Sequence, residues 1–301
     1  EISSYILRRL VEDAAKANIT GDMIEDVVIT CPAYFGPAER EATRQAGILA
    51  GLNPIYIVSE PMAAAIAYGF VDTKPQNILV YDLGGGTFDI TLISITPSGF
   101  TEIATGGDNR LGGKDWDEDL VNYFAQAFEE SIGTPANELL EDMETYQELL
   151  NEAERVKVRL SQAVKVTLKV RFKAEEVKVE VTRDKFDELT RNHLERTISM
   201  TKMMLATGEK LGVSHIDKLL LVGGSTYMPQ IIERVKKEFP FETVQNDPHM
   251  AVAKGAALLG FQCELIKLIA LKDIMEKLTG MLPSLRMPKQ DLGGLFIRLN
   301  L

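Results

Sequence analysis

The residues with the clearest chemical meaning surround three consecutive glycines at positions 84–86. An apolar run ends at the carboxylate of Asp82, and the chain leaves the glycines with the hydroxyl of Thr87 and the carboxylate of Asp89. Glycine lets backbone N–H groups approach an anion closely, and Mg²⁺ prefers one or two carboxylates together with phosphate oxygens. The segment therefore indicates a metal–phosphate site, with a plain tight hairpin as the alternative.

A second glycine pair follows another apolar run. Residues 219–222 are apolar, Gly223 and Gly224 come next, and a helix is expected from Pro229. The beginning of a helix attracts anions, and glycine allows a flat ring to pass close to the backbone. A plain strand-to-helix turn is the alternative. Two such clusters in one chain favour a nucleotide cleft more than either cluster does alone.

Glu60 is a further candidate, because it lies between a predicted strand and the helix that Pro61 opens. In open α/β sheets, ligands bind at the carboxyl ends of the strands, so this carboxylate could face the same cleft. The alternative is a carboxylate that stabilises the helix N-terminus.

The elements that would position these residues follow an α/β pattern. Apolar spacing predicts helices over residues 2–17, 37–50, 61–68, 115–130, 138–161, 184–211 and 229–239. It predicts strands over 26–30, 55–58, 77–82, 87–95, 100–105 and 219–222, and a hairpin of 164–172 with 177–181. A helix of small residues over 251–259 could pack tightly against a neighbour. An amphipathic helix is expected over 262–279.

Composition limits the classes of function. The chain has 301 residues, of which 45% are hydrophobic and 26% charged, and about 150 residues per domain predicts two globular units. The net charge of -11 argues against a nucleic-acid partner. The sequence contains no run of about 18 apolar residues, so we expect no membrane partner. Two cysteines imply no disulfide framework and fit a reducing cytoplasm. Because the chain begins at Glu1, we expect a piece of a longer protein.

Six motifs stand in a recognisable order. They are CPAYF at 31–35, SEPMAAA at 59–65, DLGGGTFD at 82–89, LGG at 111–113, VGGST at 222–226 and DPHMAVAKGAA at 247–257. Over about residues 1–260, the chain resembles the ATPase domain of the seventy-kilodalton heat-shock chaperones (the DnaK type), within the actin and sugar-kinase superfamily.

The resemblance implies an α/β, actin-like (ribonuclease-H-like) ATPase fold. The remainder of a first lobe would occupy residues 1–77, and a complete second lobe 78–260, with an inserted α+β subdomain over about 114–192. Residues 261–301 resemble nothing in the family and form a tail of unknown role.

The resemblance also implies roles for individual residues. Asp82 and Glu60 would hold Mg²⁺ through water, and Glu60 and Asp89 would help to place the attacking water. The β- and γ-phosphates would be bound by Gly84, Gly85, Gly86 and Thr87. The ribose and the base would be enclosed by Gly113, Glu154, Lys157, Ser161, Gly223, Gly224 and Ser225, with Tyr227 against the adenine. Pro32 and Arg40 would relay the nucleotide state to a peptide-binding domain.

The implied function is Mg²⁺-dependent ATP hydrolysis that drives a chaperone cycle in the parent protein. It would proceed by positioning and charge stabilisation, without a covalent intermediate. The implied partners are the peptide-binding domain, a J-domain co-chaperone and a nucleotide exchange factor, in the cytoplasm. Without the resemblance, Glu154, Lys157 and Ser161 would be read as a salt-bridged helix surface.

The sequence also departs from the family pattern. The family's first phosphate hairpin and its phosphate-contacting lysine have no counterpart in these 301 residues. Tyr227 stands where the family has arginine, His249 where it has aspartate, and Met62 where it has threonine. We therefore expect the polypeptide by itself to hydrolyse ATP weakly or not at all. Steady-state turnover comparable to that of a complete ATPase domain would contradict this.

Two other classes of function remain open. One is a different ATPase of the actin and sugar-kinase superfamily, which ATP-dependent phosphorylation of a sugar would favour. The other is a non-enzymatic nucleotide-binding or interaction module that binds a partner through the helix at 262–279. Replacing Leu265 and Ile269 by aspartate without a change in association state would exclude that helix as an interface.

Overall fold

The computed structural model describes residues 1–17, 24–69, 74–96, 99–245 and 247–261. The chain divides into two units, Glu1–Leu258 and Leu259–Leu301, and the fold below is that of the first. The amphipathic helix expected over 262–279, with Leu265 and Ile269, lies outside the described residues. Within the described part, no helix combines the length and the apolar character needed to cross a bilayer.

The first elements form a β-α-β unit. Strands β1 (Asp26–Cys31) and β2 (Asn53–Ser59) are parallel neighbours, and the connection between them is α2 (Pro37–Leu49). A proline at the first position of α2 suits a site where the N–H group has no helical partner. Helix α3 (Glu60–Gly69) begins directly after β2, so that Glu60 stands at the end of a strand, as predicted. Helix α1 (Ile2–Lys16) packs on α2.

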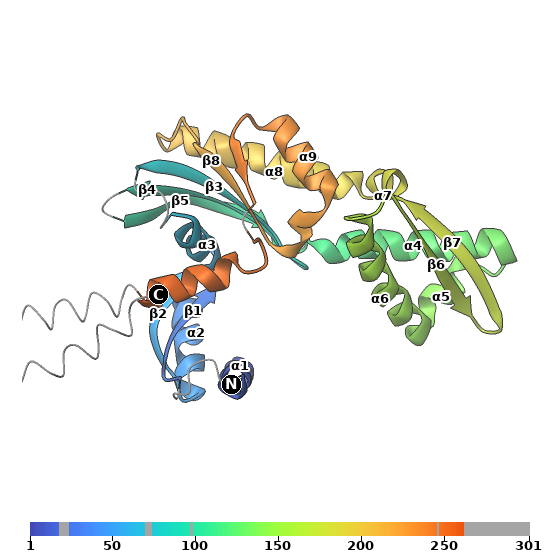
Figure 1. The fold of residues 1–301 in the computed structure, drawn as a ribbon, viewed down its shortest axis with the longest axis horizontal. Coiled ribbons are helices and arrows are strands. Elements are labelled where there is room, and N and C mark those ends of the chain that lie inside the picture. Colours follow the sequence, from blue (N-terminus) through green and yellow to red (C-terminus); the bar gives the residue numbers. More distant parts are fainter. Residues whose placement is uncertain (18–23, 70–73, 97–98, 246, 262–301) are drawn as a thin grey trace, which may run out of the picture. The chain divides into compact units, whose positions relative to one another are not determined.

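A five-stranded sheet follows in the chain (Figure 1). Its strands are β3 (Gln76–Leu83), β4 (Phe88–Thr96), β5 (Gly99–Asp108), β8 (Lys218–Val222) and β9 (Glu242–Val244). Their order is β5-β4-β3-β8-β9, with β3 antiparallel to β4 and parallel to β8. Asp82 of β3 lies beside Val222 of β8. The two glycine clusters therefore leave the same end of neighbouring strands.

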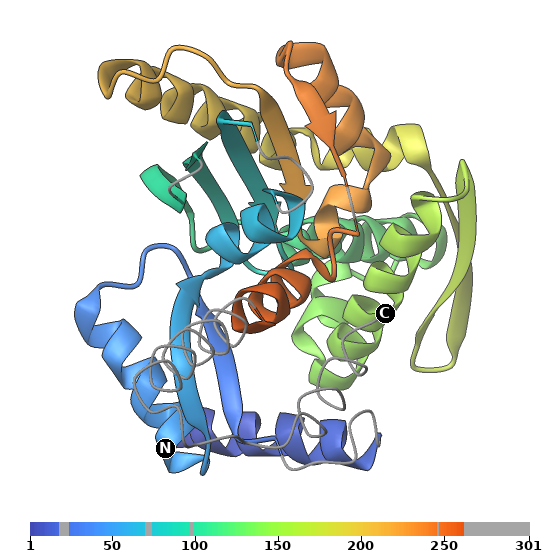
Figure 2. The ribbon, with the colours of Figure 1, turned by 60° about the vertical axis from the view of Figure 1, so that its left-hand side comes forward.

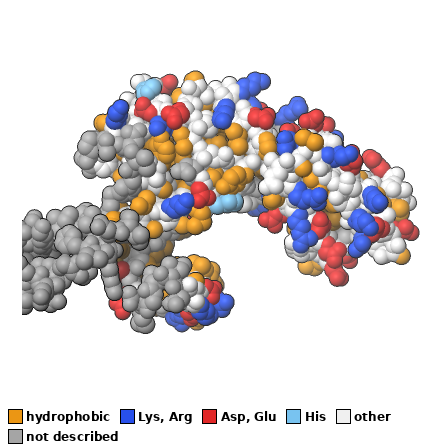
Figure 3. All heavy atoms as spheres, viewed as in Figure 1, with side chains coloured by type: hydrophobic (Ala, Val, Ile, Leu, Met, Phe, Trp, Pro, Cys, Tyr) orange, Lys and Arg blue, Asp and Glu red, His pale blue; other side chains and the backbone are white. Residues whose placement is uncertain are grey.

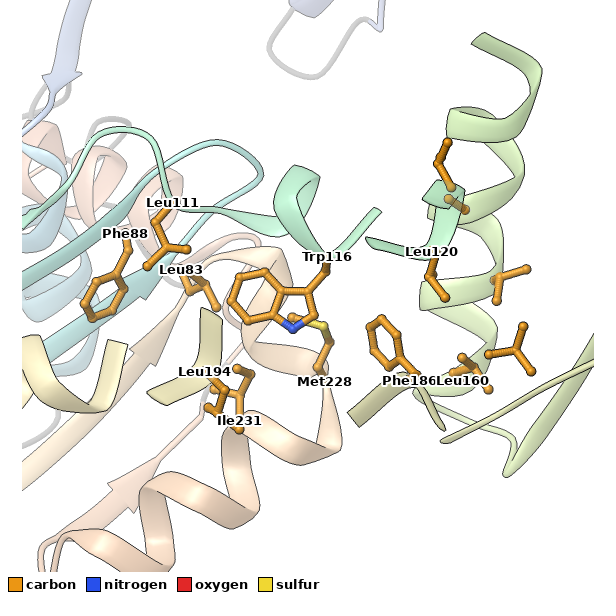
Figure 4. Packing of buried hydrophobic residues seen from close by; sticks show 14 of the residues in the cluster. Leu83, Phe88, Leu111, Trp116, Leu120, Leu160, Phe186, Leu194, Met228 and Ile231 are labelled. Atoms are coloured by element: carbon orange, nitrogen blue, oxygen red, sulfur yellow. The ribbon is translucent and has the colours of Figure 1, made fainter. Parts of the chain in front are cut away.

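The two faces of this sheet bury separate cores. Leu79, Tyr81 and Leu83 of β3 belong to the larger core, whereas Ile78 and Val80 belong to the smaller one. This alternation is the period of two that a strand imposes on its side chains. Figure 4 shows part of the larger core, in which Trp116 lies between Leu83 and Met228.

The smaller core is closed by helical residues. Ala64 and Ala65 of α3 and Ala251 of the helical segment 251–261 pack on this face of the sheet. An alanine Cβ at Gly255 would lie 1.6 Å from the carbonyl oxygen of Ala63. The helix of small residues thus packs tightly against a neighbour, as the sequence predicted.

An α+β subdomain is inserted between β5 and β8 (Figure 2). It comprises α4 (Gly113–Ile132), α5 (Ala136–Glu141), α6 (Met143–Leu160), β6 (Lys165–Phe172), β7 (Glu175–Thr182) and α7 (Arg183–Leu189). Strand β6 alternates strictly between exposed and buried residues, as expected of a strand with one solvated face. The predicted hairpin is therefore confirmed.

Two long helices that the sequence predicted are each interrupted in the structure, so the prediction of one continuous helix was wrong in both cases. The helix expected over 138–161 breaks at Asp142, whose extended backbone and side chain cap α6 by accepting a hydrogen bond from Thr145 N at 2.9 Å. The helix expected over 184–211 breaks at the buried Thr190, before α8 (Arg191–Lys210). The hydroxyl of Thr190 donates to Phe186 O and accepts from Gln230 Nε2. Local polar bonds thus override the apolar periodicity at both positions.

The connection after β8 contains a turn that was not predicted. A 3-10 turn, η1 (Gly224–Tyr227), precedes α9 (Pro229–Glu238). Consequently the N-terminus of α9 does not directly follow the glycine pair, because η1 lies between them.

Candidate functional site

The glycine turn at the end of β3 is held by its carbonyl groups. Gly84 O accepts hydrogen bonds from Gly113 N at 3.0 Å and from Ser225 Oγ at 2.9 Å. Gly85 O accepts from Lys114 N at 2.8 Å. The turn is therefore attached to the beginning of α4 and to η1, two segments that are distant in the sequence.

The N–H groups of the same turn remain available. Among the described residues, Gly85 N and Gly86 N donate to no partner. A Cβ built at either position would meet nothing within 4 Å. A backbone turn whose carbonyls are fixed and whose N–H groups are unbonded fits an anion such as a phosphate.

Close packing around the turn requires two further glycines. A Cβ at Gly112 would lie 2.5 Å from Gly86 N, and a Cβ at Gly113 would lie 2.4 Å from Ser225 Oγ. The LGG motif at 111–113 is therefore explained by the approach of α4 to the turn. Of Gly112 and Gly113, Gly113 was the one predicted to belong to the site.

Three predicted carboxylates lie close enough for their charges to interact near the end of β3. Asp82 and Asp89 are cross-strand partners. Burial, followed by the charges of Glu60 and Asp89, raises the pKa of Asp82 to about 7. Burial and the charge of Asp89 raise the pKa of Glu60. Burial also raises the pKa of Asp89, although a hydrogen bond from Thr87 opposes it.

A bound cation would relieve the repulsion between these three carboxylates. The groups that shift the pKa of Asp82 include no lysine or arginine, so a divalent ion would supply the missing positive charge. Among the described residues, no three His, Cys, Asp or Glu side chains converge closely enough to hold a metal directly. A Mg²⁺ ion here would have to take most of its ligands from water and phosphate oxygens.

Lys157 reaches the beginning of α4 from α6. Its ammonium donates to Gly113 O at 2.9 Å and to Asp117 Oδ2 at 2.5 Å. Ser161 caps the end of α6 and donates back to Lys157 O at 3.3 Å. Glu154 is exposed, and its charge raises the pKa of Asp117. Of Glu154, Lys157 and Ser161, Lys157 is thus the residue whose side chain bonds to Gly113 at the beginning of α4.

Sequence reasoning missed Asp117. It lies one helical turn after Gly113 in α4, but α4 begins at Gly113 whereas the helix was predicted over 115–130, so the i, i+4 spacing of the two residues was hidden. Burial raises the pKa of Asp117, whereas the hydrogen bond and charge of Lys157 lower it.

The structure pairs two residues that depart from the family pattern. The rings of Tyr227 and His249 have centroids 4.9 Å apart with a tilt of 37°. A Cβ at Gly224 would lie 2.5 Å from His249 Cε1, so the glycine makes room for the imidazole. Tyr227 is 40% exposed, and its ring is therefore accessible beside the glycine pair.

Pro32 and Arg40 are linked through one turn. Phe35 N donates to Pro32 O at 3.1 Å, and Arg40 Nε donates to Phe35 O at 2.9 Å. Burial raises the pKa of the neighbouring Cys31 thiol, Arg40 lowers it and Glu60 raises it. The charges of Arg40 and Glu60 therefore both act at the end of β1. The role of this pair as a relay stays a prediction.

A groove elsewhere contains none of the predicted site residues. It has a volume of about 350 Å³ and is lined by α6 and β6 of the inserted subdomain. Two of its lining residues, Arg155 and Glu152, form an ion pair within α6, and a third, Lys169, pairs with Glu176 at 2.6 Å. Figure 3 shows both signs of charge interspersed over the visible face of this subdomain, without the single basic field that a nucleic acid requires.

Comparison with known proteins supports the resemblance found in the sequence. The family model described as "Hsp70 protein" matches residues 1–280, so the expectation that nothing after residue 260 resembles the family was wrong for residues 261–280. The chaperone protein DnaK of Thermotoga neapolitana is 40% identical over 267 residues, which are 86% of this chain and 44% of that protein. DnaK of Thermotoga petrophila matches to the same extent. The chain therefore spans less than half the length of these relatives.

Proposed function

Since this chain belongs to the Hsp70 family and has its actin-like ATPase fold, we propose that it binds ATP or ADP with Mg²⁺ and contributes to the ATPase of a molecular chaperone. The observation that carries this proposal is the turn at 84–87. In this turn Gly85 N and Gly86 N donate to no partner among the described residues, and the turn connects the cross-strand pair Asp82 and Asp89. An anion cradle next to uncompensated acidic groups suits a Mg²⁺–phosphate ligand better than either component alone.

Each part of the site then has a physical task. Gly85 and Gly86 donate to phosphate oxygens, and Thr87 orients Asp89 by its hydrogen bond. Asp82 and Glu60 would hold Mg²⁺ through water, and the ion would supply positive charge to the phosphates. Asp89 would orient the attacking water. Tyr227 and His249 present ring surface beside Gly224 to the base.

The partners of the whole protein are part of the same proposal. They are a peptide-binding domain, a J-domain co-chaperone and a nucleotide exchange factor, with Pro32 and Arg40 relaying the nucleotide state. The family membership supports these partners. We also propose a cytoplasmic location, supported by the two cysteines and by the family.

Calorimetric titration of Mg²⁺-ADP into the 301-residue chain tests the proposal. We expect saturable binding that Asp82→Asn weakens by about tenfold or more, because one of the carboxylates facing the metal loses its charge. Gly224→Val should also weaken binding, since its side chain would displace His249.

Asp184→Asn is the matched control for Asp82→Asn. Asp184 is exposed in the first turn of α7, in the inserted subdomain. The Asp184→Asn variant should therefore bind ADP like the unmodified chain. Thermal denaturation of each variant separates loss of binding from loss of folding. No binding by the unmodified chain at millimolar nucleotide would contradict the proposal.

A further inference from the structure

Lys157 and Asp117 form a buried ion pair between α6 and α4. Each side chain is only 12% exposed, and Nζ lies 2.5 Å from Oδ2. Most ion pairs in the described part of the chain are far more exposed, such as that of Arg9 with Asp13, whose side chains are 68% and 51% exposed. Removing two charges from water is unfavourable, and an apolar pair of similar size would stabilise the fold as well or better. Stability alone therefore gives no reason for this pair.

The location of the pair suggests a reason. The second hydrogen bond of the ammonium goes to Gly113 O at 2.9 Å. Gly113 N donates to Gly84 O, and Ser225 Oγ donates to the same oxygen. The ammonium is thus fixed where α4, the glycine turn and η1 meet. An unpaired lysine would sample many rotamers, and holding it in one of them lowers the entropy that a ligand must overcome.

Asp117 is bonded on one side only. Oδ2 accepts from Lys157, whereas Oδ1 is buried and has no hydrogen-bond partner among the described residues. The nearby charges of Glu118 and Glu154 oppose its ionisation, and Lys157 alone favours it. All the favourable polar contacts of the Asp117 side chain are therefore made to the ammonium of Lys157.

We propose that Asp117 is a positioning residue for nucleotide binding. It holds the ammonium of Lys157 at the glycine turn, and Lys157 contacts the nucleotide while Asp117 does not. The inference rests on the proposed function, because it assigns a new residue to the same site. It predicts that Asp117 affects affinity only when Lys157 is present.

A double-mutant cycle with Mg²⁺-ADP tests this on the full chain. We expect Asp117→Asn and Lys157→Met each to weaken binding by about ten- to a hundredfold, as for loss of a charge-assisted contact. The double variant should bind as weakly as Lys157→Met, within about twofold, because the two residues act as one unit. Asp117→Glu should regain part of the affinity.

Glu130→Gln is the matched control. It removes one carboxylate charge from the exposed last turn of α4, away from the Lys157–Asp117 pair, and should leave ADP affinity unchanged. Asp117→Asn binding ADP as the unmodified chain does would overturn the inference. If Asp117→Asn does not fold, the double variant, which leaves no unpaired charge, is compared with Lys157→Met. A further loss of affinity in the double variant would then overturn the inference.

A second readout does not depend on affinity. The ¹⁵N resonance of the Lys157 ammonium, assigned by its loss in Lys157→Met, should be visible in the free chain and shift when ADP is added. It should broaden in Asp117→Asn. An ammonium signal unaffected by ADP would mean that the pair has a structural role only. Absence of any ADP binding by the unmodified chain would instead contradict the proposed function and, with it, this inference.

Discussion

Replacing Gly255 by alanine is expected to lower the free energy of unfolding by more than about 3 kcal/mol. The added Cβ would lie 1.6 Å from Ala63 O and 2.4 Å from Ala63 C, which are backbone atoms of α3. These atoms cannot rotate away as a flexible side chain would. Helix α3 cannot easily retreat either, because Ala64 and Ala65 are packed into the smaller core.

Urea denaturation followed by circular dichroism measures this loss. For a unit of this size, we expect the melting temperature to fall by about 6–12 °C as well. Ala253→Ser is the control, since it also adds one heavy atom to the same helical segment but on its exposed side. Equal denaturation midpoints for Gly255→Ala and the unmodified chain would show that the two helices are farther apart than described.

The second large effect is expected at Gly223, where alanine should reduce ADP affinity by more than about a hundredfold. Gly223 has a φ of +85°, which L side chains rarely adopt, and an added Cβ would lie 2.3 Å from Leu83 O and 2.7 Å from Asp82 Oδ1. The end of β3 must therefore move, and Asp82 moves with it. Calorimetry with Mg²⁺-ADP measures the loss.

Gly133→Ala separates the clash from the backbone strain. Gly133 has nearly the same φ, +86°, at the far end of α4, and a Cβ there meets nothing within 4 Å. This variant should be destabilised by about 1 kcal/mol and should bind ADP normally. If both variants bound ADP equally well, the contact of Gly223 with Asp82 would have no part in the site.

Local sequence patterns determined most of the elements. The period of two in β6 and the apolar runs of β3 and β8 are read directly from neighbouring residues, because a strand exposes alternate faces whatever its surroundings. The same reading failed at Asp142 and Thr190. There a side-chain hydrogen bond competes with the helix, and apolar periodicity contains no information about it.

The candidate site divides in the same way. The sequence by itself identified the three glycines and the carboxylates beside them as a candidate site, and the order of the six motifs identified the family. Only the tertiary structure decided that Lys157 reaches Asp117, and that Tyr227 meets His249. These pairs join residues 40 and 22 positions apart, and their contact depends on how α4, α6 and η1 pack, which no local pattern specifies.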